Sequence, residues 1–126
     1  MKRLMILNAP EDHTKAATLK RGLTMMIRNS LISIVEEVST ADIVVVLLSN
    51  DMPGHDPTWA KSEEAKRRRA AGSCRVLPIL VEPMAELPDH LVMLLTLPRH
   101  GKPAKTEQDW ADIAGEIRAV AMKDAV

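Results

Sequence analysis

A tryptophan and a glutamate, Trp59 and Glu63, stand four residues apart just after the most apolar segment of the chain. Residues at this spacing lie on one face of a helix. The apolar segment, residues 43–48, predicts a strand buried on both faces, as in parallel sheets. Ligands of open α/β sheets bind beyond the carboxyl ends of such strands. Glu63 is therefore a candidate catalytic acid and Trp59 a candidate ligand contact.

The rest of the chain supplies the elements that would position these two residues. Apolar runs predict strands at 4–7, 23–27, 43–48 and 75–81. Capping side chains and helical periodicity predict helices that begin near Thr14, Asn29, Asp56 and Thr106. This alternation predicts a three-layer, doubly wound α/β fold of the flavodoxin-like type. Its sheet is mostly parallel, with four to five strands, and its crossovers are right-handed.

The second strand and the second helix are the least determined elements. Gly22 can end the first helix and leave 23–27 as a strand, or the helix can continue through Met26. We favour the strand because strands and helices alternate in this fold class. The next helix follows from the i, i+3, i+4, i+7 spacing of apolar residues at Leu31, Ile34, Val35 and Val38.

Prolines limit the second half of the chain. Pro78 lacks a ladder donor, so its strand lies near a sheet edge or carries a local irregularity. Four more prolines between residues 82 and 106 leave room for a short helix at 90–95 and at most a weak fifth strand.

Composition excludes several classes of protein. A length of 126 residues predicts one domain, residues 1–126, and 17 basic residues balance 17 acidic ones. With neither net positive charge nor Phe or Tyr, the chain is a poor match for nucleic acid. The four histidines lack metal-ligand spacing, and the single cysteine, Cys74, is expected to pack beside a strand. No segment predicts a signal peptide or a membrane span, so we expect a cytoplasmic protein.

Two charged motifs have ordinary explanations. The run Lys66–Arg69 suits a solvated helix face, and if it binds anything an acidic protein surface is expected. Glu11 and Asp12 follow the first strand as the acidic pair of receiver domains does. Receivers also need a phosphorylatable Asp at the end of the third strand, where this chain has Ser49, and Asp51 comes two residues late. We therefore exclude the receiver class.

The order and spacing of several segments resemble a known family over nearly the whole chain. They are Glu11–Asp12 after the first strand, the run Ala-Asp-Ile-Val-Val-Val-Leu-Leu-Ser at 41–49, Trp59 with Glu63, 75–80 with its Pro78, and Leu97-Pro98 with Gly101-Lys102-Pro103 before a Trp-bearing last helix. Together they resemble a TIR domain, the Toll/interleukin-1 receptor type, and the bacterial versions more than the animal ones.

This resemblance implies a site. In enzymatic TIR domains a Glu four positions after a Trp promotes cleavage of NAD⁺ at the nicotinamide bond, and Glu63 and Trp59 match those positions. A lone carboxylate can hold a ribose hydroxyl and stabilise oxocarbenium-like charge, so neither a cofactor nor a metal is implied. Asn8, Ala9 and Asp12, in the loop after the first strand, match the nucleotide-binding loop.

Two functions remain open on this reading. The long loop that the family carries after its second strand is reduced to residues 28–30, and the first loop lacks an aromatic residue. These differences favour a signalling module that self-associates or docks on TIR-like or effector domains in a prokaryotic defence or stress pathway. The alternative is an NAD⁺ glycohydrolase that uses Glu63. Without the resemblance, Glu63 is explained as one of the charges on a solvated helix face.

Overall fold

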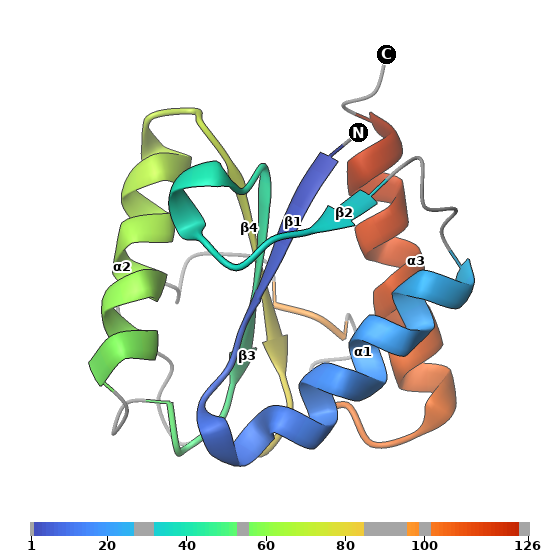
Figure 1. Cartoon of the computed structure of the whole chain (residues 1–126). Helices are drawn as coiled ribbons and strands as arrows, with labels where there is room; N and C mark the ends of the chain where they lie inside the picture. Colours follow the sequence, from blue (N-terminus) through green and yellow to red (C-terminus); the bar gives the residue numbers. More distant parts are fainter. Residues whose placement is uncertain (1, 27–31, 53–55, 85–95, 99–101, 124–126) are drawn as a thin grey trace.

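Four parallel strands form one sheet, with strand order β2-β1-β3-β4 (Figure 1). The computed structural model describes residues 2–26, 32–52, 56–84, 96–98 and 102–123. Its strands are β1 (Lys2–Leu7), β2 (Ile32–Ile34), β3 (Ile43–Leu48) and β4 (Arg75–Leu80); its helices are α1 (His13–Met26), α2 (Asp56–Ala70) and α3 (Glu107–Lys123), with short 3-10 helices η1 (Pro10–Asp12) and η2 (Val38–Thr40).

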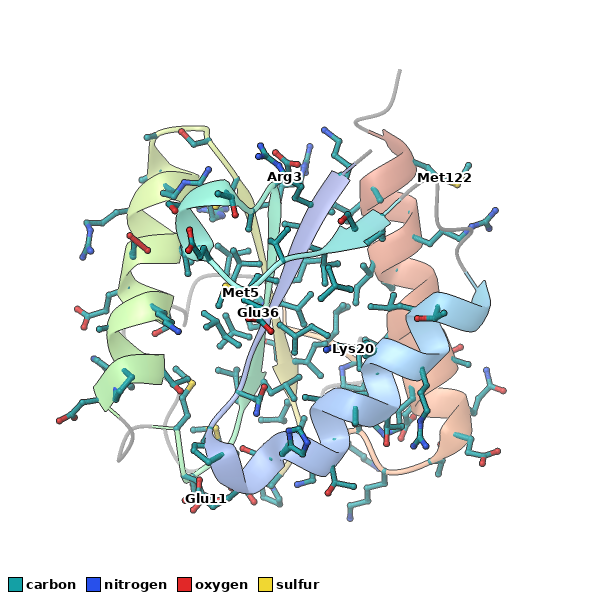
Figure 2. All side chains as sticks on the ribbon, viewed as in Figure 1. Arg3, Met5, Glu11, Lys20, Glu36 and Met122 are labelled. Atoms are coloured by element: carbon teal, nitrogen blue, oxygen red, sulfur yellow. The ribbon has the colours of Figure 1, made fainter. Side chains whose placement is uncertain are left out.

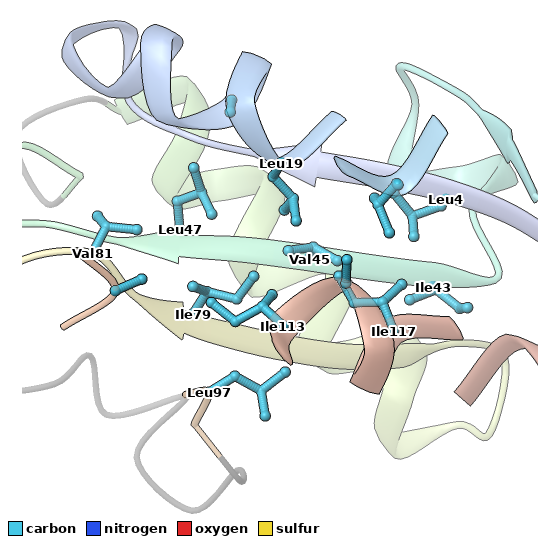
Figure 3. Packing of buried hydrophobic residues seen from close by; sticks show 14 of the residues in the cluster. Leu4, Leu19, Ile43, Val45, Leu47, Ile79, Val81, Leu97, Ile113 and Ile117 are labelled. Atoms are coloured by element: carbon cyan, nitrogen blue, oxygen red, sulfur yellow. The ribbon is translucent and has the colours of Figure 1, made fainter. Parts of the chain in front are cut away.

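Helices cover both faces of the sheet, which makes the fold three-layered and confirms the predicted flavodoxin-like α/β class (Figure 1). Residues of α1 and α3 pack on one face of the central strands, around Leu19, Ile113 and Ile117 (Figure 3). Ala65 of α2 packs on the other face. The chain runs outward from β1 to β2 in one half and from β3 to β4 in the other, so the helices fall on opposite sides.

The central strand forms as the sequence predicts. All six residues of β3 are buried, and they alternate between the two cores: Val45 packs under α1 and α3, and Val44 packs under α2. A strand flanked by β1 and β4 and covered on both faces needs apolar side chains at every position. The run 43–48 meets that requirement.

The predicted second strand at 23–27 is wrong, because α1 continues through Met26. Ala16, Leu19 and Leu23 are all buried in the same core, and they recur at helical spacing. Burying Leu23 against the sheet outweighs the roughly 1 kcal/mol that a glycine costs inside a helix. Gly22 is therefore an interior helix residue.

The predicted helix at 31–38 is also wrong. Ile32–Ile34 form β2, which pairs with β1, and only η2 lies between β2 and β3. Its β-branched residues suit a pleated edge strand better than a helix. The short loop expected at 28–30 depended on a second strand at 23–27, which the structure does not contain. Residues 28–30 themselves lie outside the described residues. The segment that follows the true second strand is 35–42.

The end of α2 and the start of α3 lie where the sequence predicts them. Gly72, with φ of 79°, ends α2, because the Ser73 N–H bonds to Arg68 C=O at 2.8 Å and the Gly72 N–H bonds to Arg69 C=O at 3.0 Å. At the start of α3 the Thr106 hydroxyl accepts the Asp109 N–H at 3.1 Å, and the Asp109 carboxylate accepts the Thr106 N–H at 3.2 Å. This is a reciprocal capping box.

Pro78 lies on β4, the outermost strand on its side, as expected for a strand that contains proline. Its carbonyl accepts the Leu97 N–H at 2.8 Å, so its donorless nitrogen faces this outer side and not β3. A parallel bridge between Ile79 and Leu97 is the trace of the weak fifth strand. The short helix predicted at 90–95 lies outside the described residues.

Candidate functional site

The carboxyl edge of the sheet, between β1 and β3, is closed by a buried polar cluster. Asp12, with 3% of its surface exposed, accepts a short hydrogen bond from the Ser49 hydroxyl, and Ser49 is fully buried. Lys15 Nζ lies 3.7 Å from Asp12 Oδ1, and Lys15 is the more exposed partner. The cluster joins the loop after β1 to the end of β3, the point where ligands of doubly wound sheets bind.

Three of the residues that the sequence predicts for nucleotide binding come together here. Ala9 is fully buried, and Asn8 is partly buried, with its amide donating to Ala9 C=O at 2.8 Å. The Thr58 hydroxyl, in the first turn of α2, donates to Asn8 C=O at 3.2 Å. Asn8, Ala9 and Asp12 thus form one loop against the start of α2. Two of the three side chains are enclosed by the protein.

Glu63 lies apart from this loop. The residues of α2 that face the sheet are Thr58, Ser62 and Ala65, all buried. Glu63 is exposed on another side of the helix and makes neither a hydrogen bond nor an ion pair with the described part of the chain. Trp59 is partly buried and packs against the α2-side core, which is the packing position that aromatic residues at helix starts often take.

Carboxylates gather on the outer side of the carboxyl edge. Desolvation, and then the charges of Glu11, Glu82 and Asp12, raise the pKa of the exposed Asp51 above its ordinary value of 3.8. Glu82 also accepts a short hydrogen bond from the Asn50 N–H. Figure 2 shows Glu11 at the same end of the molecule. No group of His, Cys, Asp and Glu in the described ranges is arranged to hold a metal ion.

A second feature is the outer edge of the sheet at β2, which is open as far as the described residues go. The Val35 N–H bonds to Leu4 C=O at 2.8 Å, so the backbone groups of Ser33 and Val35 point toward β1. Those of Ile32 and Ile34 consequently point away from the sheet. Ile34 is 37% exposed, and only Met122 joins it as an exposed large apolar side chain in the described part of the chain.

Two hollows flank these features. One, of about 500 Å³, lies between α1 and β1. Another, of about 740 Å³, lies at the amino edge of the sheet, where Lys2, Asp42, Arg69 and Arg75 line it. The Asp42 carboxylate there accepts the Arg3 N–H at 2.8 Å. Burial alone would raise the pKa of Asp42, but its hydrogen bonds and ion pair with Arg3 lower it.

Neither Glu63 nor Trp59 lines either hollow. Cys74 lines the hollow at the amino edge, but its thiol is mostly buried, and burial raises its pKa. This keeps the thiol protonated and poorly nucleophilic, in agreement with the packing role expected for it. Among the described helices, none has both the length and the apolar character to cross a bilayer.

No protein-family model matches the chain, and no curated protein is significantly similar to it. The described structure itself is a flavodoxin-like α/β fold, in which Asp12 and Ser49 are buried at the carboxyl edge and no described strand pairs with the outer side of β2.

The sequence analysis missed the partner of Asp12. Ser49 was considered only as the residue that replaces a receiver aspartate. The signal was available, because the carboxyl ends of two adjacent parallel strands meet at one edge and each is followed by a polar side chain. The open edge at β2 was missed for another reason, since it depends on which segment forms the second strand.

Proposed function

We propose that this chain is a TIR-like contact module that self-associates through the outer edge of β2 and passes on an assembly signal in a prokaryotic defence or stress pathway. The observation that carries the proposal is the outer edge of β2 at Ile32–Ile34, with which no described strand pairs. Partners on this account are other copies of the chain and related TIR-like or effector domains.

Edge strands of monomeric proteins are usually guarded by lysine, proline, a bulge or a covering segment. In β2 the side chains are Ile, Ser and Ile, followed by Val35, and Ile34 is exposed. The outward N–H and C=O groups of Ile32 and Ile34 offer a template for another strand. The exposed Glu36 and Glu37 come directly after it and limit the open edge to a few residues.

So short an edge supports a small interface, and small interfaces give weak, transient association. Enzymatic activity is less well supported than contact. Asp12 is already bound by Ser49 and Lys15, and Glu63 is exposed to solvent and is not among the buried residues of α2. Few of the groups that the NAD⁺ reaction would need are therefore gathered around a common space.

The proposal is tested with Ile34→Lys, which adds a charge to the edge and leaves the bonds between β2 and β1 in place. We expect wild-type protein to show concentration-dependent self-association in sedimentation velocity, and the variant to sediment as a monomer at every concentration. Because Ile34 is already 37% exposed, its replacement should cost little stability.

Met122→Lys is the matched control. It makes the same change at the other exposed large apolar residue in the described part of the chain, which lies on α3 and not on the edge strand. This variant should associate as the wild type does. Wild-type protein that stays monomeric at millimolar concentration would contradict the proposal, and so would equal loss of association in the two variants.

NAD⁺ glycohydrolysis by Glu63 is the second candidate. One observation favours it: α2 carries Trp59 and Glu63 at the enzymatic spacing, and its first turn touches the Asn8 loop through Thr58. The test is nicotinamide release from NAD⁺ at high protein concentration with a crowder, with Glu63→Ala beside it. Release that disappears in a folded Glu63→Ala variant would establish the enzyme. Absence of release from folded wild-type protein would exclude it under these conditions.

A further inference from the structure

The hollow of about 500 Å³ between α1 and β1 has an apolar floor. Ile6 of β1 and Ala16 and Ala17 of α1 line it. Two adjacent alanines leave the room that larger side chains would fill. Ile6 is only partly buried, although it packs against the core beneath α1 and α3. Ala17 is partly buried as well, so Ile6 and Ala17 leave apolar surface in contact with water beside the buried Ala16.

The hollow is open because β2 is short. β2 pairs with β1 only as far as the register Leu4↔Ile34. Ile6 lies two residues further along the same face of β1, where no residue of β2 stands beside it. On α1 the residues at positions 13, 17, 20 and 24 form one stripe along the flank of the helix that borders this space.

The rim of the hollow carries three basic side chains beside the neutral Asn8 and Thr24. They are His13, Lys20 and Arg21, all three exposed, and none of the described residues that line the hollow is a carboxylate. Neither Lys20 nor Arg21 forms an ion pair within the described ranges. Arg21 makes one long contact, from Nη2 to Thr18 Oγ1 at 3.5 Å. Figure 2 shows Lys20 between the ribbons of α1 and β1.

We propose that this hollow binds a small anionic amphiphile, an alkyl chain of medium length that ends in a carboxylate or phosphate. The chain would lie on Ile6, Ala16 and Ala17, and the head would meet Lys20 and Arg21. The volume is within the range of roughly 300–1,000 Å³ of small-molecule sites. The floor is aliphatic, which suits an alkyl chain. The site is independent of self-association at β2.

Octanoate is the first probe, titrated into the ¹⁵N-labelled 126-residue chain at low concentration. We expect saturable shifts of the amides of Ile6, Ala17 and Lys20. Octanamide has the same shape without the charge, and acetate has the charge without the chain, so both should bind much more weakly. Octyl phosphate then shows which of the two head groups binds more tightly.

Two variants test the residues. The double variant Lys20→Ala/Arg21→Ala should weaken octanoate binding about tenfold, as expected for the loss of a charge-assisted contact. Lys61→Ala/Arg118→Ala removes the same charge from exposed positions on α2 and α3 and should leave binding unchanged. Ala17→Leu should fill the floor and abolish binding, with the rest of the spectrum preserved.

Three results would overturn this inference. The first is an absence of saturable shifts up to about 10 mM octanoate, which is the lower limit of useful small-ligand affinity. The second is equal binding of octanoate and octanamide. The third is an equal loss of octanoate binding in the two double variants. None of them bears on whether the chain self-associates.

Discussion

At the scale of single residues, the buried Asp12 is held on two sides by polar partners. It has almost no exposed surface, and its carboxylate is held by the Ser49 hydroxyl and the Lys15 ammonium. A buried charge is tolerated only where such partners satisfy it. This cluster therefore fixes the loop after β1 to the end of β3 and leaves little of Asp12 for a ligand.

The coupling of Asp12 to Ser49 is measurable. Asp12→Ala should cost about 1–3 kcal/mol of unfolding free energy, because it leaves the Ser49 hydroxyl buried without its partner. Ser49→Ala leaves a buried carboxylate short of a donor and should cost a similar amount. The double variant should cost clearly less than the sum, since neither group is then left alone. Urea unfolding measures all three, and strict additivity would contradict the cluster.

Asp51 gives a pH dependence with a definite sign. Its pKa is raised in the folded protein, so the folded state holds this proton more tightly than the unfolded state does. Deprotonation above that pKa then favours unfolding, and the effect disappears below the ordinary value of 3.8. Asp51→Asn should therefore raise the melting temperature at pH 7 and leave it unchanged near pH 3. Salt should reduce the gain at pH 7, and a loss of stability at pH 7 would contradict the interpretation.

At the scale of elements, the sequence predicts best where one requirement dominates. Residues 43–48 must be apolar on both faces of the sheet, and Gly72 must take a positive φ. The sequence therefore predicts both β3 and the end of α2 correctly. The run 23–27 satisfies both a helix and a strand. The helical spacing of Ala16, Leu19 and Leu23 continues into this run and indicates a helix. The prediction favoured a strand instead, because strands and helices alternate in this fold class.

The candidate site was predicted less completely than the fold. That Asn8, Ala9 and Asp12 share an edge follows from a parallel sheet, in which strand ends meet. The direction of Glu63 depends on the rotation of α2 about its own axis. Polar residues, Thr58 and Ser62, occupy much of the buried face of that helix, so hydrophobic periodicity could not reveal its orientation.

The central strand allows a test of the fold itself. Val45→Asp places an unpaired charge in a fully buried position under α1 and α3. The cost of such a charge is comparable to the whole stability of a domain this size, so the variant should be unfolded. Circular dichroism and amide NMR spectra show whether the Val45→Asp variant is folded. A folded Val45→Asp protein would refute the placement of β3 between two covered faces.

At the scale of the whole molecule, the sheet is asymmetric. On the β4 side the Leu97 bridge and the Ala104 N–H continue the hydrogen bonding outward, at 2.8–2.9 Å. On the β2 side the described sheet stops at a three-residue strand with an exposed isoleucine. Association through this edge would join two sheets into one and would satisfy backbone groups that water otherwise solvates.

Hydrogen exchange at β2, followed against protein concentration, tests this account most directly. The amides of Ile32 and Ile34 point outward and should exchange quickly in dilute protein, then become protected as the concentration rises. Those of Ser33 and Val35 face β1 and should stay protected throughout, which makes them an internal reference. Protection at Ile32 and Ile34 that does not change with concentration would contradict association through the β2 edge.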